Sequence, residues 1–359
     1  MPLTVRTAIA SIPGYRPGRP APVGTGRPSY KLSSNENPFP PLPGVLAATE
    51  LACRQMNRYP DMGNAALMTA VAAKLGVSAD RLVFGTGSVA VLYHLLQTVC
   101  EPGDEVVFAW RSFEAYPIAI QVTGATPVPV PLAPGAVHDL VAMAAAVTPA
   151  TRAVLLCTPN NPTGPAIGHD DLVRFVDALP DSVLVVVDEA YVEFVTDPGA
   201  TRGLEVLAGR PNVVVLRTFS KAYGLAGFRV GYCVADPELA AAVRTVALPF
   251  GVSLPAQAAV VASLEAEPAL LERVEVIVAA REALADGLTQ LGFDVPDSQA
   301  NFVWLPAGPD TTRYADHFVT AGLMVRPYAA GESGDGVRIT VGEPEANALV
   351  LAAAATLPR

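Results

Sequence analysis

The sequence predicts an α/β protein in which a large domain with a doubly wound, mainly parallel sheet is followed by a smaller α+β domain. Up to residue 248, apolar β-branched runs alternate with Ala- and Leu-rich helical patterns, as in strand–helix repeats whose sheet is buried on both faces. After residue 248 one long helical pattern and short strands replace this alternation. The 359 residues also exceed an ordinary single-core domain. We therefore expect an arm at 1–43, a large domain at 44–248 and a small domain at 249–359, against which the arm can pack.

The individual elements have their own signals. The first 43 residues are rich in Pro, Gly and Ser, which favours an extended arm over packed elements. A glycine-rich turn precedes a helix expected at 88–99, and Asp236-Pro237, a capping acid before proline, begins another. Large-domain strands are predicted at 105–109, 152–157, 183–188, 212–217 and 228–234. In the small domain we expect a helix at 265–291, a strand at 301–305, a helix at 312–321, strands at 323–327 and 337–341, and a terminal helix.

Composition excludes several classes of protein. With 51% hydrophobic and 16% charged residues, the chain is not expected to be disordered. It contains no run of about 18 apolar residues, so no membrane span is predicted. The formal charge of −10 opposes nucleic-acid binding. Residues 1–14 show no secretory signal pattern, so we expect a cytoplasmic protein. The four cysteines form no Cys-x-x-Cys pair and the four histidines show no ligand spacing, so neither a disulfide framework nor a metal site is expected.

Polar residues follow three of the predicted strands. Asn161 lies in a turn after one, Asp188 ends the next, and Lys221 follows a third. Ligands bind at the carboxyl ends of strands in open α/β sheets, so these side chains are candidates for one site. Only three of the 24 basic residues are lysines, and a Lys amine, unlike an Arg guanidinium, can lose its proton and attack a carbonyl.

Together these segments resemble the signature of fold-type I pyridoxal-phosphate aminotransferases. The strings are Thr158-Pro-Asn-Asn-Pro-Thr-Gly164, Asp188-Glu-Ala-Tyr191 and Arg217-Thr-Phe-Ser-Lys-Ala-Tyr-Gly-Leu-Ala-Gly-Phe-Arg229. The resemblance covers nearly the whole chain. It implies the aspartate aminotransferase-like fold, pyridoxal 5'-phosphate as cofactor, amino-acid and 2-oxo-acid substrates, a role in amino-acid biosynthesis, and a homodimer with shared active sites.

The resemblance also implies roles for single residues towards the cofactor. Lys221 forms the imine and then acts as the base that moves the Cα proton. Asp188 pairs with the pyridinium nitrogen, and Asn161 and Tyr191 donate to the phenolic oxygen. The phosphate is bound at the start of a helix by hydroxyls and a fixed cation, and the pyridine ring stacks on an aromatic side chain. Phe113 is the implied ring partner. The implied phosphate ligands are Gly87, Ser88, Thr218, Ser220 and Arg229, together with Tyr59 of the neighbouring subunit.

Substrate contacts are implied in the same way. Arg338, in Gly-Val-Arg-Ile-Thr-Val-Gly, matches the family's carboxylate-binding arginine, with Asn161 beside it. Arg326 and Tyr15 are candidates for the side-chain end of the pocket. The segment 33–38 resembles an arm that closes over the substrate in the histidinol-phosphate aminotransferase branch.

Alternatives remain at three levels. The string Gly85-Thr-Gly-Ser-Val-Ala90 also fits a dinucleotide fingerprint, but no acid follows the next predicted strand. Decarboxylases and lyases share the cofactor contacts of aminotransferases. Among aminotransferases, the strings at 107–117, 298–306 and 325–328 look more like the aromatic amino acid branch, which we favour, than the histidinol-phosphate branch, which is the alternative.

Overall fold

The computed structural model describes residues 3–15, 17–18, 28–331 and 334–357. A seven-stranded sheet lies at its centre, in the order β2-β8-β7-β6-β5-β3-β4. Strand β8 runs antiparallel to both neighbours, and the other strands share one direction. The strands are β2 (Leu82–Thr86), β3 (Glu105–Trp110), β4 (Thr126–Pro131), β5 (Thr151–Cys157), β6 (Leu184–Asp188), β7 (Val213–Thr218) and β8 (Val230–Val234). The predicted α/β class with a large, mainly parallel sheet is confirmed.

Both faces of this sheet carry apolar side chains and are covered by helices. On β3, Val106 and Phe108 belong to the core of one face, and Val107 and Ala109 to the core of the other, because successive side chains of a strand point to opposite sides. The first face is covered by α4 (Ser88–Val99), α5 (Ala115–Thr123) and α9 (Pro237–Val246). The second is covered by α2 (Val45–Cys53), α3 (Ala65–Leu75), α6 (Leu140–Ala145), α7 (His169–Asp177), α8 (Gly203–Leu207) and α10 (Leu254–Glu265).

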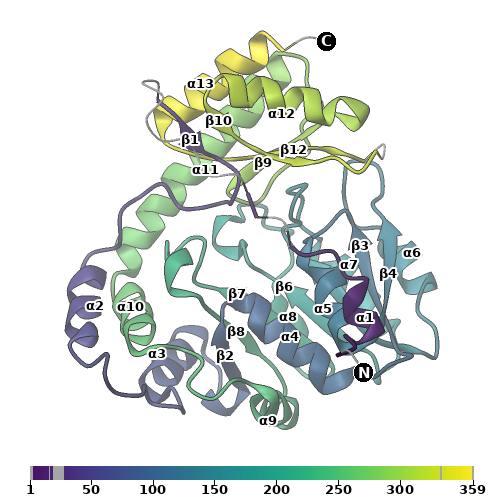
Figure 1. The fold of residues 1–359 in the computed structure, drawn as a ribbon, viewed down its shortest axis with the longest axis vertical. Coiled ribbons are helices and arrows are strands. Elements are labelled where there is room, and N and C mark those ends of the chain that lie inside the picture. Colours follow the sequence, from purple (N-terminus) through teal and green to yellow (C-terminus); the bar gives the residue numbers. More distant parts are fainter. Residues whose placement is uncertain (1–2, 16, 19–27, 332–333, 358–359) are drawn as a thin grey trace.

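A smaller sheet and three helices form the upper part of the molecule in Figure 1. Strands β9 (Phe302–Pro306), β12 (Gly336–Thr340) and β11 (Arg326–Tyr328) form an antiparallel sheet in the order β11-β12-β9. They pack with the second half of α11 (Glu267–Gln290) and with α12 (Thr311–Thr320) and α13 (Pro344–Ala355). Short 3₁₀ turns lie at η1 (Ala79–Arg81), η2 (Val192–Phe194), η3 (Ala226–Phe228) and η4 (Gly308–Asp310).

Most of the elements predicted from the sequence lie close to their observed bounds, with three corrections. The arm is not purely extended: α1 (Thr7–Ala10) lies beside α5, and β1 (Tyr30–Lys31) pairs in parallel with β10 (Leu323–Met324) of the upper part. The strand predicted at 323–327 is two strands, β10 and β11, in different sheets. The strand predicted at 228–234 starts later, because Arg229 has a left-handed backbone with φ of 57°.

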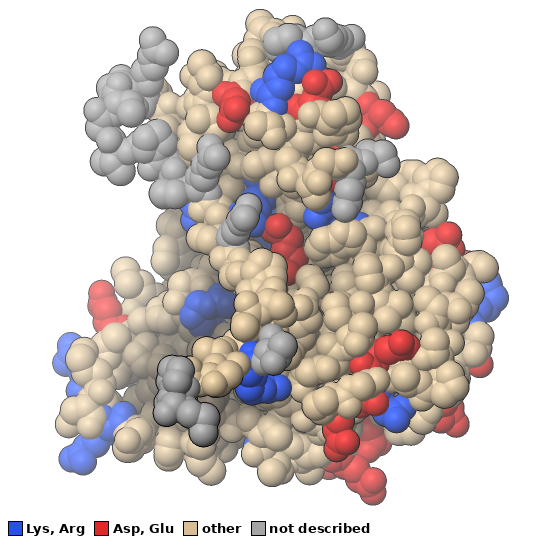
Figure 2. Space-filling model, turned by 45° about the vertical axis from the view of Figure 1, so that its right-hand side comes forward, with Lys and Arg blue, Asp and Glu red and all other residues tan. Residues whose placement is uncertain are grey.

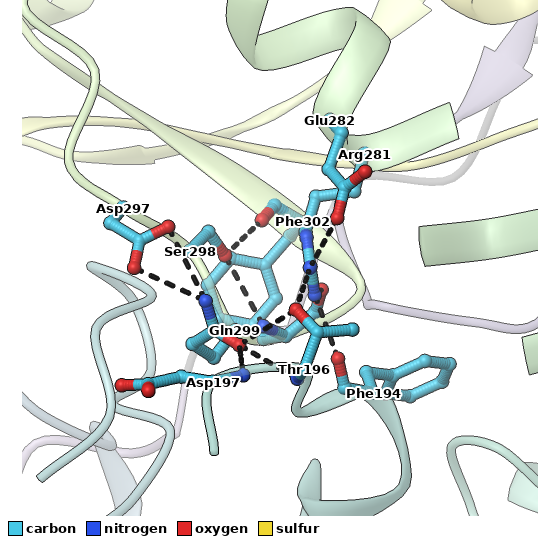
Figure 3. A network of polar contacts seen from close by, with 10 residues as sticks. Phe194, Thr196, Asp197, Arg281, Glu282, Asp297, Ser298, Gln299 and Phe302 are labelled. Carbon is cyan, nitrogen blue, oxygen red and sulfur yellow. Dashed lines mark hydrogen bonds and ion pairs between the residues drawn. The ribbon is translucent and has the colours of Figure 1, made fainter. Parts of the chain in front are cut away.

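Helix α11 connects the lower and upper parts, and a polar network fixes its middle (Figure 3). Arg281 of α11 donates to the backbone oxygen of Phe194 over 2.8 Å. The side-chain oxygen of Gln299 accepts from the backbone N–H groups of Thr196 and Asp197, at 2.9 and 3.1 Å. The loop that follows η2 of the large domain is therefore tied to the segment that leads into β9.

The boundaries at residues 43 and 248 stay predictions, as does the cytoplasmic location. No helix among the described residues is long and apolar enough to cross a membrane. Figure 2 shows basic and acidic side chains interspersed on the face it presents.

Candidate active site

A cavity of about 630 Å³ opens where β5, β6 and β7 end. Its wall combines residues of these strand ends with residues of the arm and of β11 and β12. Of the site residues predicted from the sequence, all but Gly87 and Tyr59 line it: Tyr15, Ser88, Phe113, Asn161, Asp188, Tyr191, Thr218, Ser220, Lys221, Arg229, Arg326 and Arg338. Residues from far apart in the sequence thus converge on the sheet edge where ligands of α/β proteins bind.

Lys221 lies three residues beyond the end of β7. Its Nζ donates to the backbone oxygen of Ser34 over 3.0 Å and lies 5.7 Å from the centre of the Tyr191 ring. Burial, together with the positive charge of Arg338, lowers the pKa of this amine from 10.5 to about 7. A substantial neutral fraction is therefore present near pH 7, as a nucleophile or general base requires.

Asp188 is the last residue of β6 and is buried. Its Oδ2 accepts a hydrogen bond from the Tyr116 hydroxyl over 2.7 Å, whereas Oδ1 accepts none from any described residue. Burial raises the pKa of the carboxyl from 3.8 to about 6, although the bond from Tyr116 opposes this. A buried oxygen without a donor is costly, so Oδ1 fits a ligand that presents an N–H group.

Asn161 and Tyr191 both line the cavity. The Asn161 side-chain oxygen accepts from Arg338 Nη1, which leaves its amide nitrogen to donate to a ligand. The Tyr191 hydroxyl accepts from the side-chain amide of Asn35 over 2.9 Å. Burial raises the pKa of Tyr191 above its usual value, so its phenol stays protonated. Both side chains can therefore donate to one acceptor atom.

Several groups that can donate to an anion lie together at the start of α4. Gly87, with φ of 86°, precedes the first helical residue, Ser88, and a Cβ there would come 2.5 Å from Arg229 Nη2. The Thr218 hydroxyl donates to the Ser220 hydroxyl over 3.0 Å, and Arg229 Nη1 donates to the same oxygen over 3.4 Å. Helix N–H groups, two hydroxyls and a guanidinium are the donors that bind a phosphate.

Arg338 projects from β12 and is buried. It donates to the Tyr328 hydroxyl over 3.0 Å, to the backbone oxygen of Ser33 over 2.6 Å, and to Asn161. All three acceptors are neutral, so the guanidinium keeps a charge that a substrate carboxylate can neutralise.

Phe113, Tyr15 and Arg326 form another part of the wall. The Phe113 ring packs edge-on against Tyr116, with ring centres 5.6 Å apart. Tyr15, from the arm, is half-exposed. Arg326 Nη2 donates to Glu114 Oε2 over 2.5 Å.

Tyr59 lies outside this cavity. Its side chain is 83% exposed and stacks on Phe250, with ring centres 4.7 Å apart. A role in the cavity of its own chain is therefore excluded by position, and the role predicted in a neighbouring subunit stays a prediction.

The sequence did not single out Tyr116, Asn35 or Glu114. Tyr116 lies three residues after Phe113, so the spacing of two aromatic residues was the available signal. The partners of Asn35 and Glu114 lie far away in the chain, at Tyr191 and Arg326, and nothing local reveals such pairs. No group of three or more potential metal ligands occurs within the described residues.

Two relatives of this chain share one name. The chain is 53% identical to the aromatic amino acid aminotransferase of Streptomyces avermitilis, over 97% of this chain and 95% of that protein. It is 50% identical to the protein of the same name from Thermobifida fusca, over 100% and 98% of the two chains.

Solved structures agree with the fold. The histidinol-phosphate aminotransferase of Sinorhizobium meliloti in complex with pyridoxal-5'-phosphate superposes with a TM-score of 0.85 and 31% identity, over 91% of this chain and 90% of that one. The N-succinyldiaminopimelate aminotransferase of Mycobacterium tuberculosis gives 0.83 and 26%, over 92% and 94%. The family model for aminotransferase class I and II matches residues 27–354. The resemblance found in the sequence is thereby confirmed, and the chain belongs to the class I and II aminotransferases.

Proposed function

We propose that this protein is a pyridoxal 5'-phosphate-dependent aminotransferase that acts on aromatic L-amino acids and a 2-oxo acid. One observation carries the proposal: a single cavity holds the Lys221 amine, with a pKa lowered to about 7, together with Asp188 and Arg338. These side chains offer a nucleophilic amine, a carboxylate for a cationic ring nitrogen and a guanidinium for a substrate carboxylate.

The residues present fit this cofactor. The buried Asp188 Oδ1 has no donor among the described residues, and a protonated pyridine nitrogen would supply one. Asn161 and Tyr191 would donate to the phenolic oxygen, and Ser88, Thr218, Ser220 and Arg229 would hold the phosphate at the Gly87 turn, with Phe113 against the ring. When bound, the cofactor supplies an electron sink for the electrons released at the substrate Cα.

The chain's own residues move the proton. Lys221 would take the proton from the substrate Cα and deliver it to the cofactor carbon, which needs a base with a pKa near the working pH. Arg338 would orient the substrate by its carboxylate, displacing the Ser33 oxygen from the guanidinium.

The aromatic substrate is supported by the wall of the cavity and by the relatives' names. Phe113, Ile118 and Tyr15 line the same cavity as Arg338 and offer an apolar and aromatic surface. The relatives that match at about half identity are named aromatic amino acid aminotransferases.

A homodimer with shared sites is part of the proposal. Tyr59 and Phe250 form an exposed aromatic pair, and Leu51, Met56, Met62 and Leu248 are exposed in the same segments of the chain. An exposed apolar surface of this kind fits a subunit interface. Tyr59 would then reach the phosphate of the partner's site.

Steady-state kinetics test the substrate. We expect kcat/KM for phenylpyruvate or 4-hydroxyphenylpyruvate to exceed that for histidinol phosphate. A histidinol-phosphate value well above the aromatic ones favours the alternative, and the absence of a bound yellow chromophore after incubation with pyridoxal 5'-phosphate and gel filtration rules out the cofactor.

A further inference from the structure

Gln257 is a buried amide of α10 that takes no part in the reaction as proposed. Its side chain is 5% exposed, and its Nε2 donates to two backbone oxygens, that of Asp61 over 3.3 Å and that of Val252 over 3.0 Å. A glutamine amide nitrogen has two protons, so both are used. One side chain thus joins two segments that are distant in the sequence, the loop between α2 and α3 and the turn before α10. Helices α2 and α3 both pack against α10 (Figure 1).

Each of the two joined segments carries an exposed aromatic side chain. Tyr59 lies in the loop and is 83% exposed, and Phe250 lies in the turn and is 40% exposed. Their rings stack with centres 4.7 Å apart and planes inclined by 29°. Stacking alone holds the rings to each other. The hydrogen bonds of Gln257 hold both segments to the buried face of α10, so they fix where the stacked pair lies on the protein.

The backbone of Phe250 is strained. Its φ of 56° lies in the left-handed region, which bulky side chains rarely adopt. Such a conformation costs free energy and persists only where neighbouring contacts hold it. On one side of Phe250 the Val252 oxygen accepts from Gln257, and across it the Gly251 N–H donates to the Leu248 oxygen over 3.1 Å. A strained residue held in this way indicates a functional reason for presenting the aromatic pair.

The aromatic pair lies near the part of the cavity where the phosphate donors gather. A second pocket, of about 320 Å³, is lined by both joined segments and by Thr86 of β2. Thr86 also lines the active-site cavity and precedes the turn that begins α4. In a two-fold symmetric dimer the same surface patch of each subunit meets. A Tyr59 within this patch would then lie close to the start of α4 in the partner's site.

We propose that Gln257 is a positioning residue: by holding both segments, it places the Tyr59 hydroxyl where it reaches the cofactor phosphate in the partner's site. The inference rests on the proposed function and deepens its shared active site. Gln257 acts through Tyr59 and touches neither cofactor nor substrate.

A purely structural role is the competing explanation, since Gln257 also contributes to the packing of α10. Ser263 offers a matched control on the same helix. It is fully buried, and its hydroxyl donates to the Ala259 oxygen of α10 itself over 2.7 Å. Ser263→Ala therefore removes a buried hydrogen bond without releasing another segment.

The test measures the dissociation constant of pyridoxal 5'-phosphate by absorbance titration of the cofactor-free dimer, whose assembly is checked by sedimentation. Gln257→Met removes both donors and keeps a side chain of similar length. We expect the constant to rise about tenfold, as for the loss of one hydrogen bond to a charged group. Tyr59→Phe, which removes the hydroxyl itself, should raise it by a similar factor. The double variant should bind no more weakly than Tyr59→Phe, because both changes remove the same contact. Ser263→Ala should leave the constant unchanged.

Mixed dimers show whether Gln257 acts through Tyr59. Activity is measured after verified subunit exchange, at a cofactor concentration that saturates only the wild-type site. Gln257→Met mixed with Lys221→Ala should recover activity, because the site with an intact Lys221 receives a Tyr59 held by an intact Gln257. Gln257→Met mixed with Tyr59→Phe should not, because neither site receives a correctly placed tyrosine hydroxyl.

Several outcomes would overturn the inference. They are wild-type cofactor binding by the Gln257→Met dimer, an additive loss in the double variant, recovery in the mixture with Tyr59→Phe, and an equal loss in Ser263→Ala. Dissociation of the Gln257→Met dimer would assign the residue to assembly and overturn it as well. Gln257→Asn, whose amide is too short to span the same two oxygens, replaces the Met variant if that does not fold.

The proposed function can fail separately. If Tyr59→Phe binds the cofactor as tightly as wild type, the proposed shared site fails together with the inference. If Tyr59→Phe weakens binding and the Gln257 variants do not, the shared site stands and the inference alone fails.

Discussion

Asn35 donates its side-chain amide to the hydroxyl of Tyr191 over 2.9 Å, and both residues are buried. The orientation of this amide is fixed by Thr340, whose hydroxyl donates to the Asn35 side-chain oxygen over 3.1 Å and accepts from the Asn35 N–H over 2.9 Å. Because the tyrosine oxygen already accepts one hydrogen bond, its own proton is directed elsewhere, into the cavity. The arm therefore sets the donor direction of a residue 156 positions away.

Removing this amide should change the electronic state of the bound cofactor. In Asn35→Ala the Tyr191 hydroxyl loses its fixed orientation and donates less well to the phenolic oxygen. We expect the pKa of the bound cofactor, read from its absorbance, to rise by about 0.5 to 1 unit. The reason is that the ionised phenolic oxygen of the cofactor is less stabilised. A pH titration of the absorbance measures this. Asn212→Ala, which removes a side-chain amide that donates to the Val183 oxygen just before β6, is the control and should leave the pKa in place.

Lys221→Ala should lose turnover while retaining bound cofactor. The phosphate and ring contacts persist without the amine, but no neutral base remains for the Cα proton. We expect kcat to fall by a factor of about 10³ or more, with cofactor still present after gel filtration. Transamination at near the wild-type rate would remove Lys221 from the mechanism.

Asp188→Asn should abolish most activity with the fold intact, since an amide does not hold the pyridinium proton. Circular dichroism and kcat are measured on the same preparation. Comparable rates in the variant and the wild type would show that the carboxylate is not needed.

Asp188→Asn should also stabilise the cofactor-free protein against unfolding. This stabilisation should be present only above about pH 4. Because burial raises the folded-state pKa of Asp188 from 3.8 to about 6, the stability that its protonated form contributes is complete below pH 4 and is lost as the pH rises through 6. Asparagine does not titrate, so the variant does not lose this stability as the pH rises. At pH 7 the difference should reach at most about 3 kcal/mol. Urea unfolding of both proteins from pH 4 to 8 measures it, and a difference that is constant over this range contradicts the assigned burial effect.

Mixing Tyr59→Ala with Lys221→Ala protein should recover part of the activity. In a dimer with shared sites, a hybrid contains one site in which both residues are intact. Activity after verified subunit exchange is the readout. Neither parent alone should show it, and no recovery would count against Tyr59 acting in the partner's site.

Gln299→Ala should lower stability more than activity. Its side-chain oxygen accepts from two backbone N–H groups that link the large domain to the segment before β9, and these donors would lose their partner (Figure 3). We expect a loss of about 2 to 3 kcal/mol in the free energy of unfolding. Gln290→Ala, at the exposed end of α11, is the control and should change stability by less than about 0.5 kcal/mol.

Local patterns predicted β3, β5, β6, β7, β8 and α4 well, because buried strands and helix starts leave their signal in adjacent residues, but they did not yield β2 or β4. The convergence of Asn161, Asp188 and Lys221 followed from one rule, that the carboxyl ends of parallel strands meet at one edge. The pairing of β1 with β10 was not predictable in this way, since two residues of the arm carry no pattern of their own. The same holds for Glu114 with Arg326, whose separation of 212 residues leaves charge as the only clue.

Helix α11 belongs to both apolar cores of the protein. Leu270, Val274 and Ile277 pack with the core of the large sheet, and Leu284 and Leu288 pack with the core of the small one. Arg281 lies between these two sets and is held by the Phe194 oxygen. Severing the chain near Arg281 would expose an apolar helical stripe on each fragment, so neither fragment would be expected to remain soluble alone. Thermal unfolding should accordingly proceed as one cooperative transition rather than as two, with the helix transmitting the loss of either core to the other.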